Sequence, residues 1–381
     1  SIVPESKDFQ PYLGKPLTIN IDEILSIYPS EDGIGTMIHA ENNQNTWKVI
    51  EDIDTVTVDF TAHCNAMCGN CSRNLGGAEV NPRMPLEHMS PTTFKKLFSE
   101  KVLDNINQIV FNGSYGDPLI SPYMFECLDY LKEHKKPVIH IHTNGGMRQP
   151  KFFSELALKL KDFPFPSHVV FSIDGLEDTN HLYRRNVRWN KVMDNAQAFL
   201  DAGGLGRWRM LVFEHNAHQL EQAEQLSAKM GFAKFEINGG HTFTAMNSMV
   251  NNAIEKFKAN KKEQARTIKY DTSKLDNIKR LKDLKKTHGS LDKGFAKSCI
   301  TCKWQKKGKI QISHMGEVFP CCYTLADRYP KDLNSPYGKD IGTITWLNVN
   351  DAPLTDILES NTLTDPMDKR FKICEVTCGA V

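Results

Sequence analysis

The sequence predicts an α/β fold built on a parallel sheet, and two observations carry this prediction. Six short apolar runs between residues 54 and 240 are typical of strands, and stretches with helical spacing separate them. Such alternation indicates βαβ units with right-handed crossovers. Six units are fewer than the eight of a closed barrel, so a partial (β/α)6 TIM-type barrel and an open doubly wound sheet both fit.

The expected elements follow one another in a regular order. Strands are expected at residues 55–60, 108–113, 138–145, 168–175, 207–216 and 232–239. Helical stretches between them include residues 90–103, 125–134 and 218–231. In a barrel and in an open sheet alike, functional side chains gather in the loops at the carboxyl ends of the strands.

Composition divides the 381 residues into four expected parts. Residues 1–50 form an N-terminal extension, in which residues 14–30 suggest a small helix or strand. Residues 51–245 hold the alternating elements, and residues 246–297 form a basic connecting segment. Residues 298–381 form a small C-terminal domain with short strand-like pieces.

Charge and hydropathy argue against several classes of protein. The net charge of +1 provides no overall field for nucleic acid or a membrane surface. No apolar run reaches the roughly 20 residues of a membrane helix, and the first residues lack the blocks of a signal peptide. We therefore expect a cytoplasmic protein. Residues 255–310 hold eighteen Lys or Arg against six Asp or Glu, which indicates a solvated connector or a surface for an acidic peptide or RNA.

The ten cysteines fall mainly into two groups, and a reducing compartment argues against disulfides. Cys64, Cys68 and Cys71 follow the first expected strand at the spacing C-x3-C-x2-C. Cys127 stands alone among apolar residues and is interpreted as part of the core. The second group lies in the last 83 residues and consists of Cys299, Cys302, Cys321, Cys322, Cys374 and Cys378.

A loop with three thiolates suits a particular kind of metal centre. A zinc site takes four ligands, usually as two pairs. A [4Fe–4S] cluster has four irons, usually with one cysteine on each. Three thiolates therefore leave one iron without a protein ligand, and that iron is able to bind a small molecule.

The spacing of Cys64, Cys68 and Cys71 resembles the motif of the radical S-adenosylmethionine (SAM) superfamily. In that family the open iron binds the amino and carboxylate groups of SAM. Reductive cleavage of SAM gives a 5′-deoxyadenosyl radical, which abstracts a hydrogen atom from the substrate. The resemblance implies a partial (β/α)6 barrel, one catalytic [4Fe–4S] cluster, bound SAM, and an external electron donor such as flavodoxin or ferredoxin.

Later segments resemble further motifs of the family in the expected order. Tyr115, Gly116, Asp117 and Pro118 resemble its GGEP motif, with Tyr in place of the first Gly and Asp in place of Glu. The resemblance implies that Tyr115, Gly116 and Asp117 hold the SAM amino group. The stretch HTNGG at 142–146 resembles the TNG motif that follows.

The stretch at 172–186, SIDGLEDTNHLYRRN, resembles the S-x-D-G…H-x-x-Y-R pattern of the SPASM branch of the family. The resemblance implies that Ser172 contacts the ribose or carboxylate region of SAM. It also implies that Arg184 pairs with the SAM carboxylate, and Arg185 is the alternative. Asn216 matches a recurring position of this branch whose role is left open.

Two features of the sequence stand apart from these motifs. Asn70 occupies the place before the third cysteine, where the family often has an aromatic residue beside the adenine. His140 and His142 share one face of their expected strand. We expect them to be hydrogen-bonded structural histidines, with substrate contact as the alternative if that face is the barrel lumen.

The second cysteine group resembles the opening of SPASM and twitch domains, which bind auxiliary iron–sulfur clusters. The resemblance lies in Cys302-x13-Gly316-x4-Cys321, with a hairpin between the two thiolates. Six cysteines are fewer than the two clusters of a full SPASM domain need, which favours a twitch form with one auxiliary [4Fe–4S] cluster. Its expected ligands are Cys302, Cys321, Cys374 and Cys378.

Alternatives remain for this second group. Cys299, Cys302 and Cys321 resemble an open three-ligand cluster, and a zinc site is also compatible with thiolates. Cys322 stands where sulfatase-maturating relatives place an Asp thought to act as a base.

The residues and the resemblance together predict a radical SAM enzyme, an oxidoreductase of the dehydrogenase or peptide-modifying type. Its substrate is expected to be a peptide, a protein or a small molecule. One alternative is an RNA-modifying enzyme that uses residues 255–310. The other is a zinc or iron–sulfur binding module without enzymatic activity.

Overall fold

The computed structural model separates two compact units, residues 1–46 and 47–381. The residues that the structure describes are 49–239, 302, 304–326, 328–331 and 345–360, with the strand residues 24–29 and 36–40 and the short pieces 254, 257, 283 and 285–289. In the first unit, β1 (Ile24–Pro29) pairs antiparallel with β2 (Thr36–Ala40). The element expected within residues 14–30 is therefore a strand.

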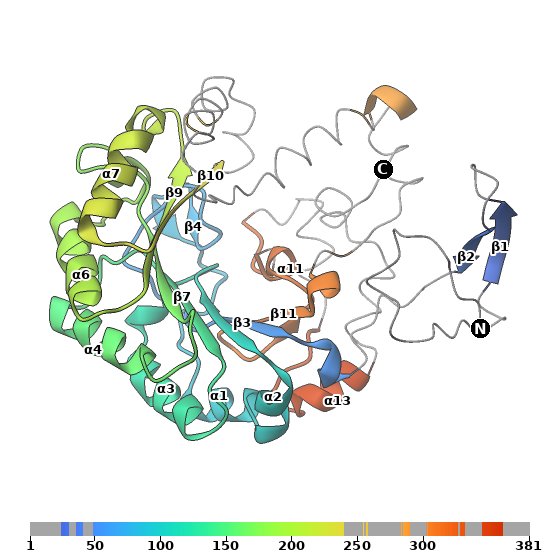
Figure 1. Ribbon diagram of the computed structural model, residues 1–381. Helices are drawn as coiled ribbons and strands as arrows, with labels where there is room; N and C mark the ends of the chain where they lie inside the picture. The colour runs from blue at the N-terminus through green and yellow to red at the C-terminus, as the bar shows by residue number, and fades with distance from the viewer. Residues whose placement is uncertain are drawn as a thin grey trace. The chain divides into compact units, whose positions relative to one another are not determined.

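An eight-stranded sheet forms the centre of the second unit (Figure 1). Its strands are β3 (Thr55–Asp59), β6 (Gln108–Asn112), β7 (Val138–Thr143), β8 (His168–Ser172), β9 (Gly206–Val212), β10 (Lys234–Gly239), β11 (Lys309–Ile312) and β12 (Val318–Phe319). The spatial order is β10-β9-β8-β7-β6-β3-β11-β12, and only β11 and β12 pair antiparallel. Six parallel strands in chain order confirm the predicted βα units. Among the described strands, β10 and β12 do not pair, so the barrel is partial.

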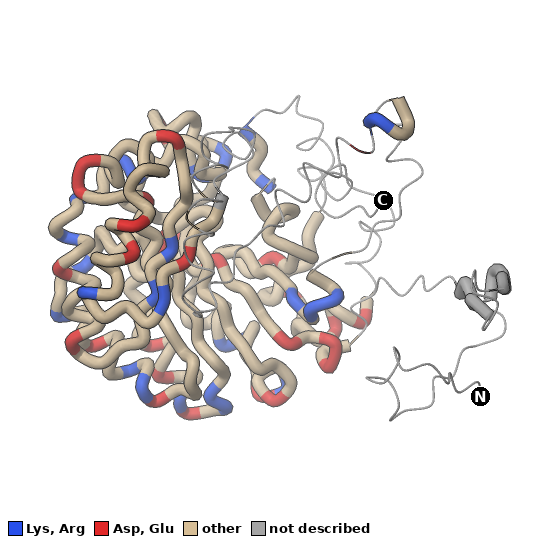
Figure 2. The backbone as a smooth tube through the Cα atoms, turned by 45° about the horizontal axis from the view of Figure 1, so that its top comes forward, with Lys and Arg blue, Asp and Glu red and all other residues tan. Residues whose placement is uncertain are grey.

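Helices between the strands cover one face of the sheet (Figure 1). They are α1 (Pro91–Leu97), α2 (Glu100–Asn105), α3 (Met124–Glu133), α4 (Pro150–Leu160), α5 (Asn180–Tyr183), α6 (Trp189–Asp201) and α7 (Leu220–Met230). The single helix expected at 90–103 is two helices. Ser90 caps α1 through its side chain, and the non-helical backbone of Phe98 ends it before α2 begins. Charged residues of both signs are spread over these outer helices (Figure 2).

The side chains of the strands alternate between two faces of different character. The helix-covered face is apolar, and its core residues are Ile109, Phe111, Ile139, Ile141, Phe171, Trp208 and Met210. Ring contacts such as Phe153–Phe171 and Phe171–Phe199 join this face to α4 and α6. The opposite face, here called the open face, carries polar side chains that include Gln108, His140, His142, His168, Arg207 and Arg209. The helices thus bury one face and leave the other for polar chemistry.

The C-terminal part joins the barrel through strand pairing. β11 lies parallel to β3, and β12 turns back along β11. The hairpin expected at Gly316 is therefore present, and Gly316 has a φ of 87°, which favours glycine. Gln311 on β11 donates to Asp59 on β3 at 2.7 Å, so side chains reinforce the backbone pairing.

Shorter elements complete the described part. They are β4 (Asn74–Leu75), β5 (Glu79–Val80), η3 (Ile50–Asp52), η4 (Pro118–Ile120), η5 (Ala217–Gln219), η6 (Gln305–Lys307), α11 (Cys322–Ala326) and α13 (Leu354–Glu359). Within the described residues, no helix combines the length and the apolar character that a membrane crossing requires.

Candidate active site

The loop after β3 presents three thiols at the carboxyl end of the sheet. Cys68 is buried, and Cys64 and Cys71 are partly buried. Burial raises the pKa of Cys64 to about 12 and that of Cys68 to about 11, and it also raises the pKa of Cys71. These thiols therefore ionise only when a positive group such as a metal centre stabilises the thiolates.

Hydrogen-bonding groups from three other loops surround these sulfurs. Asn144 Nδ2 lies 3.6 Å from Cys64 Sγ, and the Arg184 side chain lowers the pKa of Cys68 through charge and a hydrogen bond. Cys71 Sγ lies 3.8 Å from the carbonyl oxygen of Ser114. The motifs quoted from the sequence thus converge on the cysteine loop.

The donor set fits an iron–sulfur cluster better than a single ion. In the part of the chain that is described, no three His, Cys, Asp or Glu side chains are grouped to hold one metal ion. A [4Fe–4S] cluster takes one thiolate on each of several irons, so its thiolates need not converge on one point. The three cysteines with their raised pKa values match that requirement.

Asp117 joins the loop after β6 to the loop after β7. Its carboxylate accepts hydrogen bonds from Thr143 Oγ1 at 2.8 and 2.9 Å, from the amide of Asn144 at 2.7 Å and from the amide of Leu119 at 3.1 Å. Burial raises the pKa of Asp117, although these bonds oppose the shift. The chain's own donors therefore surround this carboxylate, for which the resemblance implies contact with the SAM amino group, and Asp117 links the two loops.

Gly116 lies where the chain leaves no room for a side chain. A Cβ there would stand 2.2 Å from the carbonyl oxygen of Thr61 and 2.7 Å from that of His63. The amide of Asp117 donates to the same His63 carbonyl at 2.9 Å. Glycine at this position lets the GGEP-like loop pack against the start of the cysteine loop.

The Tyr115 side chain is only 1% exposed and packs against the C-terminal part. Its hydroxyl donates to the carbonyl of Leu325 in α11, and its ring lies 5.6 Å from the ring of Tyr329. Its backbone amide donates to Asp59 Oδ1 at 3.3 Å. Any contact between Tyr115 and a ligand at the cysteine loop would involve its backbone and not its ring.

The two neighbouring arginines have different surroundings. Arg184 Nε donates to Asp174 Oδ2 at 2.6 Å and reaches Cys68, whereas Arg185 Nη1 donates to the carbonyl of Gly77 at 3.3 Å. Asp174 is fully buried and also accepts from the amide of Leu211 at 2.7 Å. The Arg184 side chain therefore reaches Cys68, whereas Arg185 contacts the cysteine loop through its carbonyl, which accepts from the amide of Met67 at 3.0 Å.

Ser172 and Asn216 also lie where strands end. Ser172 is the partly buried last residue of β8 and lies opposite Arg209 of β9. Asn216 donates to the carbonyls of Asp174 and Leu211 at 2.8 and 2.9 Å. Asn216, for which the sequence suggested no role, therefore holds the turn after β9 beside Asp174 through its side-chain amide.

Sequence reasoning missed several polar residues that build this site. Asn144 and Asp174 stood inside the quoted motifs but were given no role. Arg73 donates to the carbonyl of Ala62 at 2.9 Å and braces the cysteine loop. Asp59, at the end of β3, accepts from the amide of Ser114 at 2.6 Å. The available signal was a single acidic residue, Asp59, among the Thr, Val and Phe residues of the expected strand 55–60.

Asn70 and the two histidines lie in different surroundings. Asn70 is exposed on the cysteine loop. His140 and His142 lie on the open face of the sheet, as their spacing predicts. His140 bonds to Gln108 at 3.0 Å, and its ring lies 3.9 Å from the ring of His168. The first of the two is therefore a hydrogen-bonded histidine, as expected.

The C-terminal cysteines are described in part. Cys302 and Cys321 are 6% and 8% exposed. Burial raises the pKa of Cys321 to about 12, and nearby Cys302 adds to that shift. Cys322 begins α11. The other expected ligands, Cys374 and Cys378, and the alternative Cys299 lie outside the described residues, as does most of the basic stretch 255–310.

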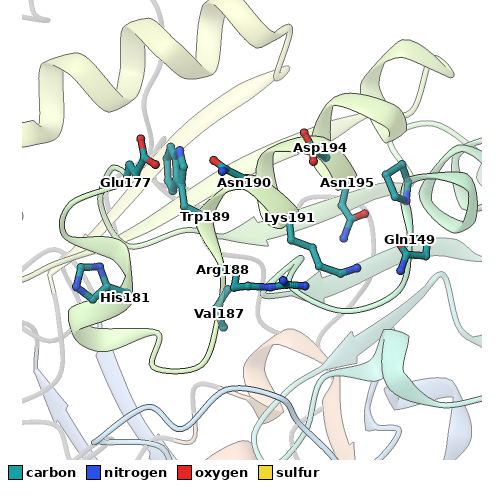
Figure 3. A pocket seen from close by; sticks show the side chains of 11 residues that line it. Gln149, Glu177, His181, Val187, Arg188, Trp189, Asn190, Lys191, Asp194 and Asn195 are labelled. Carbon is teal, nitrogen blue, oxygen red and sulfur yellow. The ribbon is translucent and has the colours of Figure 1, made fainter.

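A separate pocket of about 730 Å³ lies at the N-terminal ends of α4 and α6 (Figure 3). Arg188 and Lys191 line it together with Glu177 and Asp194, so positive and negative charges balance. Figure 3 shows the two basic side chains extending toward Gln149. Because charges of both signs line this pocket, we assign no ligand to it.

Comparison with protein families gives two matches. The model of the radical SAM superfamily matches residues 58–226, and the model of the SPASM iron–sulfur cluster-binding domain matches residues 299–379. The first match contains the cysteine loop and every strand from β6 to β9. The second contains the hairpin of β11 and β12 and the whole C-terminal cysteine group. No curated protein matches the chain at a significant level.

Solved structures share the fold at low sequence identity. The structure of anSMEcpe with bound AdoMet is 16% identical with a TM-score of 0.55, over 84% of this chain and 81% of that one. SuiB of Streptococcus suis bound to S-adenosylmethionine is 12% identical with a TM-score of 0.55, over 85% and 72%. SuiB bound to the precursor peptide SuiA is 13% identical with a TM-score of 0.55, over 87% and 71%. At these identities the likeness concerns the fold alone.

Proposed function

Because the chain belongs to the radical SAM superfamily and carries a SPASM iron–sulfur domain, we propose that it cleaves S-adenosylmethionine reductively and uses the 5′-deoxyadenosyl radical to take a hydrogen atom from a substrate. A [4Fe–4S] cluster, when bound, supplies the electron for that cleavage. The observation that carries the proposal is the convergence of Asn144, Ser114 and Arg184 on three buried or half-buried thiols.

In this proposal the cysteine loop and its neighbours hold the cofactors. Cys64, Cys68 and Cys71 ligate the catalytic cluster. Gly116 lets its loop pack against the start of the cysteine loop, so that this loop lies beside SAM, and Ser172 lies at the end of β8 on the open face. These positions surround one end of the sheet, where ligands of parallel α/β proteins bind.

Arg184 is the proposed partner of the SAM carboxylate. Asp174 fixes its Nε at 2.6 Å, which leaves the two Nη groups to be shared between Cys68 and an anion. Its charge raises the electrostatic potential around buried thiols that must ionise to bind iron. A planar guanidinium suits a carboxylate better than an ammonium does.

For the C-terminal part, we propose one auxiliary [4Fe–4S] cluster held by Cys302, Cys321, Cys374 and Cys378. The burial of Cys302 and Cys321 and the influence of one on the other's pKa support the first half of this set. The auxiliary cluster would assist electron transfer or substrate binding, and flavodoxin or ferredoxin would supply electrons from outside.

The proposed substrate is a peptide or protein, with a small molecule as the second choice. Structures of the same fold are described as bound to the precursor peptide SuiA and to the Cp18Cys peptide. Two-electron oxidation of a C–H or alcohol group, or modification of a peptide, would both use such an arrangement. We propose that the enzyme works in the cytoplasm, where reduced flavodoxin or ferredoxin is present.

The test is the formation of 5′-deoxyadenosine from SAM by the anaerobically reconstituted protein with dithionite. Changing Cys64, Cys68 and Cys71 together to Ala is expected to abolish it. Cys127→Ala is the matched control, because this buried cysteine lies in the helix-side core and is expected to leave cleavage intact. Cleavage that persists in the triple variant contradicts the proposal.

A further inference from the structure

A group of charged side chains lies on the open face of the sheet, on the adjacent strands β9 and β10. Glu236 forms ion pairs with Arg209 at 2.8 Å, with Lys234 at 2.8 Å and with Arg207 at 3.7 Å. We call these four residues the open-face cluster. Three positive charges against one negative charge leave it with a net charge of +2. The outer surface, by contrast, mixes both signs (Figure 2).

The carboxylate of Glu236 is already paired with these three cations, so it does not neutralise the remaining charge of +2. Its Oε2 accepts from Arg209 Nε at 3.1 Å and from Arg209 Nη2 at 2.8 Å. Hydrogen bonds from Lys234 and Arg209 and the charges of both hold the pKa of Glu236 at about 2 against the effect of burial. The carboxylate is therefore ionised at physiological pH, and the excess of positive charge remains.

Arg207 makes the longest contact with the carboxylate of the cluster. Its guanidinium has only the 3.7 Å contact with Glu236, and it has no hydrogen-bond partner among the residues that the structure describes. Burial lowers the pKa of Arg207, and the charge of Arg209 lowers it further. A half-buried cation without hydrogen bonds is costly unless an anion joins it.

Among the described residues, the histidines beside the cluster on this face add no negative charge. Burial lowers the pKa of His140 to about 3 and that of His168 to about 4, so both rings are neutral at physiological pH. The pKa of His142 is lowered well below its usual value, first by burial and next by Arg209. His142 makes no hydrogen bond within the described part of the chain, so its ring is able to donate one to a ligand.

The open-face cluster lies beside the proposed SAM site. Ser172, at the end of β8, is paired in register with Arg209 on β9. Neighbouring strands lie about 4.8 Å apart. A group bound by Arg209 therefore lies next to the residue that we place near SAM, on the face where a substrate must enter.

We propose that the open-face cluster binds an oxyanion of the substrate, a carboxylate or a phosphate group, through Arg207 and Arg209 with His142 as a further donor. The inference rests on the proposed function, because it treats the open face as the substrate side. One oxyanion reduces the net charge of the cluster and gives Arg207 the hydrogen bonds that it lacks. Each guanidinium is planar and has donors at fixed positions, so the two together also orient the anion. This holds the substrate next to Ser172.

The test uses the full-length, SAM-loaded protein and three probes under anaerobic conditions. N-acetyl-L-glutamate and inorganic phosphate represent the two oxyanions, and N-acetyl-L-glutaminamide, in which both carboxyl groups are amides, is the neutral match of the first. Saturation-transfer NMR and titration calorimetry measure their binding. We expect at least one of the two anions to bind and N-acetyl-L-glutaminamide not to bind. Binding of N-acetyl-L-glutamate alone supports a carboxylate, and binding of phosphate alone supports a phosphate group.

Variants assign the binding to particular residues. Arg209→Gln is expected to weaken anion binding by about tenfold or more, because a charge-assisted hydrogen bond is lost. Arg207→Gln removes no existing hydrogen bond and is the milder variant if Arg209→Gln folds poorly. Glu236→Gln raises the net charge to +3 and is expected to tighten binding. Arg188→Gln, in the separate pocket of Figure 3, is the control and should bind as the unaltered protein does.

Two results overturn the inference. One is equal binding of N-acetyl-L-glutamate and N-acetyl-L-glutaminamide, and the other is equal anion binding by Arg207→Gln and Arg188→Gln. Formation of 5′-deoxyadenosine by the unaltered protein is measured in the same preparations. Cleavage without anion binding overturns only this inference, whereas anion binding without cleavage overturns only the proposed function.

Discussion

At the scale of single residues, burial determines what the polar groups of this site do. Asp174 is 0% exposed, and its carboxylate holds Arg184 at 2.6 Å. A charge pair taken out of water needs both partners, since removing one leaves an uncompensated charge. Asp174 therefore positions Arg184, and Arg184 is the residue able to reach a ligand at the cysteine loop.

The two adjacent arginines provide a matched pair for testing this role. Arg184→Lys keeps the charge but loses the planar donor fork, and we expect SAM affinity to fall by about tenfold or more. Arg185→Lys is expected to bind SAM almost normally, because Arg185 donates to Gly77. Equilibrium dialysis with labelled SAM measures both, and a larger loss in Arg185→Lys would contradict the assignment.

Gly116 gives a second prediction at this scale. Gly116→Ala places a Cβ 2.2 Å from the Thr61 carbonyl, so the loop must shift, and we expect the melting temperature and the iron content both to fall. Overpacking of this kind costs roughly 1–3 kcal/mol. Gly69→Ala is the control from the cysteine loop, since its Cβ would have an ordinary 3.7 Å contact. Differential scanning fluorimetry and iron analysis compare the two, and equal effects would rule out the steric explanation.

At the scale of elements, Asp59 at the end of β3 connects two neighbouring segments, the loop after β6 and β11. Asp59 accepts hydrogen bonds from the amides of Ser114 and Tyr115 after β6 and from Gln311 on β11. Gln311 Oε1 is buried without a partner. A protonated or amide side chain at position 59 is able to donate to that oxygen if the Gln311 amide rotates. Asp59 thus links the GGEP-like loop to the C-terminal hairpin.

This arrangement predicts a pH effect on stability. Burial raises the pKa of Asp59 from 3.8 to about 7, so the folded protein holds this proton more tightly than the unfolded chain does. The contribution of Asp59 to stability is therefore lost as the pH rises from about 4 to about 7. Asp59→Asn should remove this loss, and its melting temperature should rise relative to that of the unaltered protein between pH 5 and pH 8.

The pKa shift of Asp59 sets the size of the expected change in stability. The rise from 3.8 to about 7 corresponds to about 4 kcal/mol at most. Asp54→Asn changes an exposed carboxyl just before β3 and is measured over the same pH range as the matched control. If the curves for Asp59→Asn and the unaltered protein run parallel, the titration of Asp59 does not contribute to the pH dependence.

At the scale of the whole molecule, the sheet carries the cysteine loop and, of the C-terminal cysteines, the described Cys302 and Cys321. The cysteine loop follows β3, and the C-terminal group begins and continues on either side of β11, which pairs with β3. Tyr115 adds a side-chain contact between the GGEP-like loop and α11. The two metal centres that we propose are thus joined by one continuous piece of structure.

Iron analysis tests the number of centres in the whole molecule. The reconstituted protein is expected to hold about eight irons per chain, four for each [4Fe–4S] cluster. Changing Cys302 and Cys321 together to Ala should reduce this to about four and leave 5′-deoxyadenosine formation measurable. Cys127→Ala should keep all of the iron. A value near four in the unaltered protein removes the auxiliary cluster from the proposal.

Much of this arrangement could be predicted from the sequence because it is local. The alternation of apolar runs and helical stretches determined six βα units, since a strand and its helix are defined by neighbouring residues. The C-x3-C-x2-C spacing and the motifs after later strands pointed to one site, because parallel strands end at the same edge. The side-chain alternation of β7 also placed His140 and His142 on one face.

The tertiary structure decided what depends on distant partners. The choice between Arg184 and Arg185 depends on where Asp174 is buried, and the direction of Tyr115 depends on α11, more than 200 residues away. The excess charge around Glu236 appears only when β9 and β10 lie side by side. Local sequence fixes which chemistry the chain carries, whereas burial and long-range pairing decide which groups are free to use it, because both arise only when separate segments pack.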